Sequence, residues 1–410
     1  MLVNIIRNMK VIFGFNALNQ DGMSSTAITL MRALKDQGVN VQPVHAWRDI
    51  KVPNYEEEFH PIFVTDSEDE PNVEEVIQKM VSIVNSDNEC KIFSHFGSPN
   101  WACIVPYLRE DIRVVVSCHS ITPSALKISL AYKERASAFV PVSWEVEEKL
   151  KSKLSKTEQS KIHLVTNVVD PEKFIPKTNY QHSGKIKIIF FGRVEDVTKG
   201  CDKIPLIAKQ LKERNIDFEW DLYGYFHWGF EERFYPLLKE HDVEDVVNYK
   251  RCLNADEIPQ ILPQYDIMVM PSNHEGCPNA LLEAMCVGLP CVASLLHFVT
   301  DKIVIDGKDG ALAHKNDISG FAEKISELAT NSAYRESVGQ AARAKVLKDF
   351  SIEKQGKGYK EIFDKVLASH NYRMVCAPDI ENFRQPSTVK PHILARILPL
   401  WFKRLLKKYI

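Results

Sequence analysis

Two carboxylates in the second half of the chain, Glu275 and Glu283, could act together because they flank the start of a predicted helix. A helix N-terminus offers free backbone N–H groups and a partial positive charge, which suits a phosphate or diphosphate. The two side chains would lie ~12 Å apart if every step between them were helical, so they cannot share one proton. They could bind separate polyols on either side of a diphosphate, as a nucleotide-sugar requires. The spacing by itself favours a plainer alternative, an ordinary helix with a solvated glutamate at each end.

The elements around these glutamates are expected to be a strand, a loop, a helix and a second strand. The apolar run 265–270 predicts a buried strand, and Pro278 suits the first helical position because it lacks the N–H that would be unpaired there. Gly288 is expected to end the helix and Pro290 to prevent its return. The residues from Cys291 then begin a second strand. This order of elements is the repeating unit of a parallel sheet.

The whole string from Glu275 onward resembles a known family signature. Its residues are Glu-Gly-x-Pro-Asn-x-Leu-Leu-Glu-Ala-Met-x-x-Gly-x-Pro-x-Val-Ala-Ser. They are similar to the E-x7-E signature of retaining GT-B glycosyltransferases of family 4, the glycosyl transferases group 1. The resemblance implies that Glu275 is a catalytic-site residue holding donor-sugar hydroxyls and that Glu283 holds the ribose. It also implies donor contacts from the residues between them: Gly276, Cys277, Pro278, Asn279 and Ala280.

A strand and loop earlier in this half supply two cations. The apolar run that ends at Gly192 predicts a strand, and the glycine lets the backbone turn sharply, which leaves Arg193 and Lys199 on the following loop. Arginine and lysine in a loop are usually solvated, but two cations here can neutralise a leaving diphosphate. The pattern Gly-Arg-x5-Lys-Gly resembles the diphosphate-clamping segment of the same family. That resemblance implies catalytic roles for Arg193 and Lys199 and a donor contact at Gly192.

A nucleobase site is implied by the resemblance alone. The family places backbone contacts to the base in the segment that here runs from Val246 to Leu253, which gives Cys252 and Leu253 a donor-binding role. Arg251 stands where the family commonly has glycine. The base preference therefore stays open at this stage.

The first half begins as a Rossmann-like domain does. A strand from Lys10, a polar loop containing Gly22, a helical pattern at 26–34 and a second strand follow one another. No G-x-G-x-x-G is present, so a dinucleotide site is not supported. The family usually carries a Gly-Gly pair in this loop, close to the donor phosphate and the acceptor. By resemblance, Gly22 is the residue carried over to that role.

Two predicted strands of the first half each end in a histidine, His95 and His119. In an open parallel sheet, ligands bind beyond the carboxyl ends of the strands, so both side chains are expected to face the crevice. A single strand-end histidine is more often a satisfied structural residue. His119 also matches the position of the family's active-site histidine near the acceptor. The prediction of a functional role for His95 rests only on its place at the end of a strand.

Composition excludes several classes of function. The chain has 52 basic and 54 acidic residues, so no overall charge favours nucleic acid. Nine cysteines without a C-x-x-C pair argue against a disulfide framework or a zinc site and indicate a reducing compartment. The acidic cluster 66–70 lacks the spacing of a metal-binding D-x-D, so no metal site is predicted. No run of about 18 apolar residues is present, so we expect a cytoplasmic protein.

The C-terminal tail lies outside the resemblance. Residues 390–410 contain six basic residues and no acidic ones, and their apolar residues can share one helical face. Such a helix suits an anionic membrane surface, where each basic residue adds roughly 1 kcal/mol. That would place the protein at the inner face of the membrane. The alternative is a terminal helix packed on its own domain or on a partner subunit.

Together these patterns predict an α/β protein of the GT-B class, with two Rossmann-like doubly wound parallel-sheet domains facing across a cleft. We expect a retaining, metal-independent glycosyltransferase without a cofactor, moving a hexosyl unit from a nucleotide-diphosphate sugar to a glycan or lipid-linked glycan acceptor in polysaccharide or lipid-linked oligosaccharide synthesis. The alternatives are a nucleotide-sugar epimerase of the same architecture and a non-catalytic nucleotide-sugar binder. The predicted parts are an acceptor domain (1–176), a donor domain (177–352), a helix returning to the first domain (353–368) and a basic amphipathic tail (369–410).

Overall fold

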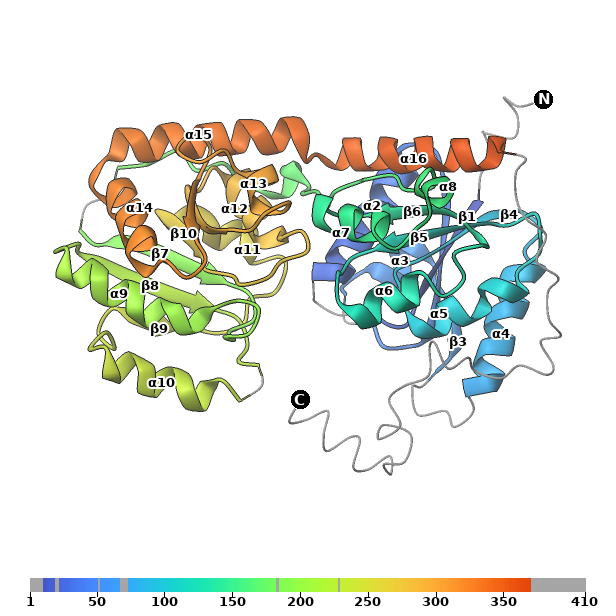
Figure 1. Ribbon diagram of the computed structural model, residues 1–410, viewed down its shortest axis with the longest axis horizontal. Coiled ribbons are helices and arrows are strands. Elements are labelled where there is room, and N and C mark those ends of the chain that lie inside the picture. The colour runs from blue at the N-terminus through green and yellow to red at the C-terminus, as the bar shows by residue number, and fades with distance from the viewer. Residues whose placement is uncertain are drawn as a thin grey trace. The chain divides into compact units, whose positions relative to one another are not determined.

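The computed structural model of the protein describes residues 10–369 apart from 19–21, 51, 67–72, 182–183 and 228. The chain forms two compact units (Figure 1). Unit 1 joins the chain up to Asn167 with the segment that starts at Ile352, and unit 2 is Val168–Ser351. This division and the predicted boundary after residue 176 both precede the first strand of unit 2. The predicted membrane-binding segment 390–410 lies outside the described residues.

Unit 1 is built on a six-stranded parallel sheet with the order β3-β2-β1-β4-β5-β6. Its strands are β1 (Lys10–Phe15), β2 (Asn40–Trp47), β3 (Ile62–Thr65), β4 (Cys90–His95), β5 (Arg113–Cys118) and β6 (Ala136–Pro141). Its helices are α2 (Gly22–Asp36), α3 (Tyr55–Phe59), α4 (Val73–Ser86), α5 (Pro99–Ile104), η1 (Val105–Tyr107), α6 (Pro123–Ser129), α7 (Trp144–Lys151), α8 (Lys156–Gln159) and α16 (Ile352–Ala368).

Both faces of this sheet are buried, which explains why its strands read as nearly continuous apolar runs. Alternate residues of β5 enter two different hydrophobic clusters: Val114 packs in one, together with α4 and α5, and Val115 packs in the other, together with α2 and α16. The return helix α16 approaches α2 closely, since a Cβ on Gly356 would lie 2.6 Å from the Ala33 carbonyl oxygen. Helix α16 therefore completes the first unit.

Unit 2 repeats the plan, with the strand order β12-β11-β10-β7-β8-β9. Its strands are β7 (Ile186–Phe191), β8 (Phe218–Tyr223), β9 (Val247–Tyr249), β10 (Ile267–Met270), β11 (Cys291–Leu295) and β12 (Ala311–His314). Its helices are η2 (Pro171–Lys173), η3 (Cys201–Lys203), α9 (Ile204–Glu213), α10 (Glu231–Glu240), α11 (Ile258–Ile261), η4 (Leu262–Gln264), α12 (Asn279–Val287), α13 (Thr300–Ile303), α14 (Ile318–Thr330) and α15 (Ser332–Asp349).

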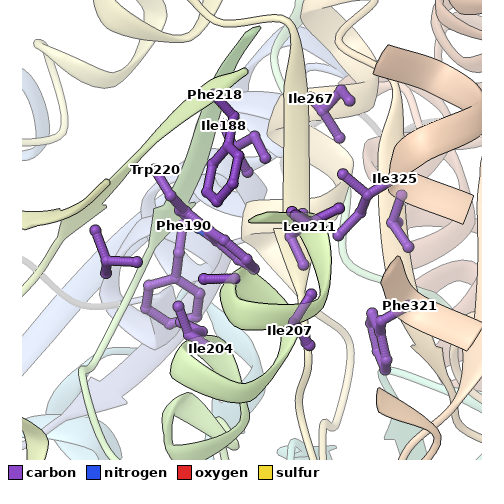
Figure 2. Packing of buried hydrophobic residues seen from close by; sticks show 14 of the residues in the cluster. Ile188, Phe190, Ile204, Ile207, Leu211, Phe218, Trp220, Ile267, Phe321 and Ile325 are labelled. Carbon is purple, nitrogen blue, oxygen red and sulfur yellow. The ribbon is translucent and has the colours of Figure 1, made fainter. Parts of the chain in front are cut away.

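The core of unit 2 lies between the sheet and the helices α9 and α14. Figure 2 shows Phe190 and Trp220 from the sheet among side chains that include Leu211 of α9 and Phe321 of α14. All four are buried to within 1% exposure, so they hold the strands and helices in a fixed relation. Rigid strands matter here because the loops that follow them carry the candidate site.

The predicted fold class is confirmed: both units are Rossmann-like, doubly wound parallel sheets, the class of fold that GT-B enzymes use. In each sheet the order reverses at one place, between β1 and β4 in unit 1 and between β7 and β10 in unit 2. Ligands of open parallel sheets bind outside the carboxyl ends of the strands at such switch points. No helix among the described residues is long and apolar enough to cross a membrane.

Candidate functional site

The candidate site is built from two loops that leave neighbouring strands of unit 2. The first loop runs from Arg193 to Gly200 after β7, and the second runs from Pro271 to Glu275 after β10, which pairs with β7. Gly200 has a φ of 63°, and a Cβ there would lie 2.3 Å from the Pro271 carbonyl oxygen. A glycine is therefore needed where the two loops come closest.

Hydrogen bonds join the two loops. The backbone N–H groups of Asn273 and His274 donate to the Thr198 carbonyl oxygen over 2.7 and 3.2 Å. The Asn273 side-chain amide also donates to the Asp196 carbonyl oxygen at 2.8 Å. These bonds place the second loop against the first, and neither Thr198 nor Asn273 was predicted from the sequence. The signal that could have found them is a short polar residue in each of the two loops that follow strands adjacent at the switch point.

Two of the predicted catalytic residues lie in direct contact. The Lys199 ammonium group donates to both carboxylate oxygens of Glu275, at 2.7 and 3.0 Å. The Ser272 hydroxyl donates to the same carboxylate at 2.7 Å. The side chains of Lys199 and Glu275 are 23% and 8% exposed, so this ion pair is partly shielded from solvent. The structure thus brings a cation and a carboxylate from different loops to one point at the edge of the sheet.

The other predicted cation, Arg193, is held by a residue that sequence reasoning missed. Its guanidinium lies 3.5 Å from a carboxylate oxygen of Glu195 and 3.4 Å from the Thr198 hydroxyl. Glu195 is only 2% exposed and also accepts hydrogen bonds from the Thr198 backbone N–H and hydroxyl. This buried carboxylate fixes both the shape of the loop and the direction of Arg193. Its position between the two cations in the Gly-Arg-x5-Lys-Gly string was the available signal.

Helix α12 follows the second loop, and its first residue differs from the prediction. Pro278 is the N-cap, with a φ of −75° and an extended ψ of 100°, and the helix begins at Asn279. The prediction was one residue early because a proline φ suits both positions and only ψ separates them. Gly288 ends the helix in the left-handed conformation, with a φ of 85°, as predicted. The predicted donor contacts at Gly276, Cys277, Asn279 and Ala280 occupy the approach to the helix and its first turn, and their roles stay predictions.

Glu283 lies on the second turn of α12, and burial raises the pKa of its carboxyl to about 7. Within the part of the chain that the structure describes, no cation forms an ion pair with it. A carboxyl that is half protonated near neutral pH can both accept and donate hydrogen bonds. This chemistry suits a pair of sugar hydroxyls.

The predicted nucleobase segment is a closed loop. Arg251 forms a bidentate contact with Glu257 at 2.5 and 2.9 Å, and the same carboxylate accepts the Asn254 backbone N–H at 2.8 Å. Arg251 also donates to the Cys252 carbonyl oxygen at 2.9 Å. This backbone oxygen, which was predicted to contact the nucleobase, therefore already accepts one hydrogen bond. The arginine that replaces the family's usual glycine thus shapes the loop that carries Cys252 and Leu253.

In unit 1, the two predicted histidines lie at the carboxyl edge of the sheet, at or just beyond the ends of β4 and β5. Burial lowers the pKa of each imidazole to about 4, so both are neutral at physiological pH. His95 is 1% exposed, and its Nδ1 accepts the Gly97 backbone N–H at 3.2 Å, which gives it a structural part in that turn. The His119 Nε2 is buried without a hydrogen-bond partner among the described residues, and the ring packs against Phe96 at 5.1 Å. The acceptor roles of both histidines stay predictions.

Gly22 differs from its predicted place in a polar loop, because α2 begins at this residue instead of at Thr26. The Thr26 hydroxyl donates to the Gly22 carbonyl oxygen at 2.8 Å and so stabilises the first turn. Its part in binding the acceptor or phosphate stays a prediction. Over the described residues, no group of three or more His, Cys, Asp or Glu side chains could hold a metal ion.

A family model covers the region that contains this site. Residues 171–345, which include both loops and α12, match it. The family is glycosyl transferases group 1. The match contains the Gly-Arg-x5-Lys-Gly segment and the Glu275–Glu283 string, so the residues that carried the sequence resemblance fall inside the glycosyl transferase match.

Known relatives are similar to part of the chain. One relative is WcaL of Escherichia coli, which is named as a colanic acid biosynthesis glycosyltransferase. It is 31% identical over 210 residues, which are 49% of this chain and 48% of that protein. The amylovoran biosynthesis glycosyltransferase AmsK of Erwinia amylovora is 29% identical over 212 residues, 50% of this chain and 51% of that protein. The chain thus spans about half the length of these curated relatives.

Solved structures of glycosyltransferases share the fold over most of the chain. A glycosyltransferase of Rickettsia africae superposes with a TM-score of 0.73 at 16% identity and covers 88% of this chain and 99% of its own. Anabaena HepE, solved in complex with UDP, superposes with a TM-score of 0.72 at 16% identity over 87% of this chain and 100% of its own. At these identities the likeness establishes the fold.

Proposed function

We propose that this protein is a retaining, metal-independent glycosyltransferase that moves a hexosyl unit from a nucleotide-diphosphate sugar to a glycan acceptor. The observation that carries the proposal is the meeting of Lys199 and Glu275 at the switch point of unit 2, with α12 following directly. One loop supplies two cations for a diphosphate, the other supplies a carboxylate for sugar hydroxyls, and the helix adds free N–H groups.

In the proposed reaction, the bond between the anomeric carbon and the diphosphate oxygen breaks, and a bond forms from that carbon to an acceptor hydroxyl oxygen. The electron pair of the broken bond and the acceptor's proton both pass to the nucleoside diphosphate. Arg193 and Lys199 stabilise the negative charge that grows on this leaving group, the task that a metal ion performs in other transferases. Because Arg193 is held by Glu195 of its own loop and Lys199 by Glu275 of the neighbouring loop, both cations are already oriented before the donor arrives.

Glu275 is proposed to hold the donor-sugar hydroxyls and Glu283 the ribose. The raised pKa of Glu283 supports a hydrogen-bonding role, since a charged carboxylate is disfavoured at its position. Retention of configuration follows from the family resemblance. Unit 1 is proposed to bind the acceptor at the sheet edge that carries His119.

The names of similar proteins guide the choice of donor and acceptor. One relative, from Escherichia coli, is named UDP-Gal:alpha-D-GlcNAc-diphosphoundecaprenol alpha-1,3-galactosyltransferase and is 30% identical over 217 residues, 54% of that protein. Anabaena HepE has been solved with UDP-glucose. We propose a UDP-hexose donor and a glycan or lipid-linked glycan acceptor in surface-polysaccharide synthesis. A cytoplasmic protein that binds the inner face of the membrane through residues 390–410 would meet such an acceptor.

The test is incubation with UDP-glucose and UDP-galactose, first alone and then with glycan acceptors, with the products identified by NMR. A transferase yields a new glycosidic bond with the donor's anomeric configuration, and slow hydrolysis when the acceptor is absent. Release of an epimerised nucleotide-sugar would replace the proposal with the epimerase alternative. Tight donor binding without turnover for any acceptor would leave only a binding function.

A further inference from the structure

Lys203, which follows Lys199 in unit 2, is buried against the loop that carries Glu275. It ends η3, four residues after Lys199, and is 6% exposed. Its ammonium group donates to the Pro271 carbonyl oxygen at 2.6 Å, to the Asn273 side-chain oxygen at 2.8 Å and to the Lys315 carbonyl oxygen at 2.7 Å. All three N–H bonds of the ammonium are therefore used, and each acceptor is an uncharged oxygen.

These acceptors come from separate parts of the sheet edge. Pro271 and Asn273 belong to the loop after β10 that carries Glu275, and Lys315 directly follows β12. Gly200 makes room for the connection, since a Cβ there would lie 2.6 Å from the Cε of Lys203 as well as against Pro271. A single cation thus ties the start of α9 to the loop that presents the predicted sugar-binding carboxylate.

Burying a cation without a carboxylate among its hydrogen-bond partners is unfavourable, and this supports a specific role. Burial lowers the pKa of Lys203 to about 8, although the neighbouring Asp202 opposes the shift. An apolar residue could fill such a position without that penalty, whereas a three-donor ammonium can bind three oxygens at once. The gain from the lysine is therefore the fixed geometry of the loop.

We propose that Lys203 is a positioning residue that sets the loop Pro271–Glu275 so that Glu275 meets the sugar of the donor. This inference rests on the proposed function for its ligand, but its structural part concerns the loop alone. The cation acts through Asn273 and Pro271 and does not touch the donor. Its loss should accordingly weaken recognition of the sugar and spare recognition of the nucleotide.

The experiment compares Lys203→Gln and Lys203→Met with wild type, and uses Lys209→Met as the control because Lys209 is exposed on the adjoining helix α9. Hydrogen exchange reports on the loop through the amides of Asn273 and His274, which bond to Thr198. Calorimetry measures the affinity for UDP and for UDP-glucose. Thermal unfolding identifies any variant that has failed to fold, and the glutamine variant keeps two donors in case the methionine variant does so.

We expect both Lys203 variants to exchange the two loop amides faster than wild type while amides of β8 are unchanged. Their affinity for UDP-glucose should fall about tenfold, with UDP affinity within about twofold of wild type, and Lys209→Met should match wild type. Unchanged loop exchange in a folded variant would overturn the proposal, as would equal losses for UDP and UDP-glucose. Wild-type protein that binds neither compound would count against the proposed UDP-sugar donor, and the exchange result would still decide the role of Lys203 in the loop.

Discussion

Replacing Lys199 with alanine should damage turnover much more than donor binding. The lysine meets a charge that grows on the diphosphate as the glycosidic bond breaks, so most of its contribution is made in the transition state. Removing one preorganised group from such a charge costs about 2.7–4 kcal/mol, or about 10²–10³-fold in kcat. We expect Lys199→Ala to fall in this range.

The effect on donor binding is limited by the ion pair that Lys199 forms with Glu275. With side chains 23% and 8% exposed, the pair lies between surface and buried cases. Surface pairs contribute about 0–1 kcal/mol and breaking buried ones costs about 3–5, so about 1–2 kcal/mol is a reasonable value here. When the wild-type protein binds the donor, the Lys199–Glu275 ion pair breaks and Lys199 contacts the diphosphate instead. The alanine variant loses both the new contacts and the competing pair, so its donor Kd should rise by less than about tenfold.

The assay measures donor Kd by calorimetry and kcat at saturating donor for wild type, Lys199→Ala and the exposed-surface control Lys308→Ala. Thermal unfolding shows that each variant is folded, which matters because, among the described residues, Glu275 is left with only the side-chain hydrogen bond from Ser272. Equal losses in kcat and in donor affinity would refute the transition-state role. Full activity of Lys199→Ala would remove the residue from the mechanism.

Two further substitutions and one deletion test other parts of the site and the tail. Gly200→Ala should destabilise unit 2 by about 2 kcal/mol or more in urea unfolding, because the residue combines a φ of 63° with a Cβ contact at 2.3 Å. Gly307→Ala is the control, since Gly307 has a similar φ without a close contact and should show only the backbone cost of about 1 kcal/mol. Equal losses of stability in the two variants would refute the close packing of the loops at Gly200. The raised pKa of Glu283 means that the folded state keeps its proton longer than the unfolded chain does, so stability should decline from the ordinary glutamate pKa up to about pH 7. Glu283→Gln should remove this decline in a pH series of thermal melts, and an unaltered pH dependence would contradict the assigned shift. Deleting residues 391–410 should move the protein from membranes to the soluble fraction, and an unchanged distribution would exclude the anchor.

Much of the fold could be predicted because it is encoded locally. Apolar runs identified the strands that end at Phe191 and Met270, and the glycine at 288 marked the end of α12, since its left-handed conformation is costly for other residues. Two boundaries were wrong for local reasons as well. Proline suits both the N-cap and the first helical position, and α2 begins at Gly22, ahead of the apolar helical pattern that starts at Thr26.

The supporting residues of the site could not be predicted because their partners are distant in the sequence. Lys203 bonds to atoms 68 and 112 positions away, and nothing in its own neighbourhood distinguishes it from a solvated lysine. The contact between Lys199 and Glu275 spans 76 positions and depends on β7 and β10 being adjacent. Only the strand order of unit 2 shows that these loops share one edge.

The bidentate contact between Arg251 and Glu257 has a practical consequence for engineering. This contact closes the loop between its own two ends, and the Arg251 carbonyl oxygen also accepts the Gly224 backbone N–H at 2.9 Å. If Cys252 and Leu253 contact the base as predicted, libraries confined to residues 252–256, which keep the Arg251–Glu257 pair, should change which heterocycle is accepted.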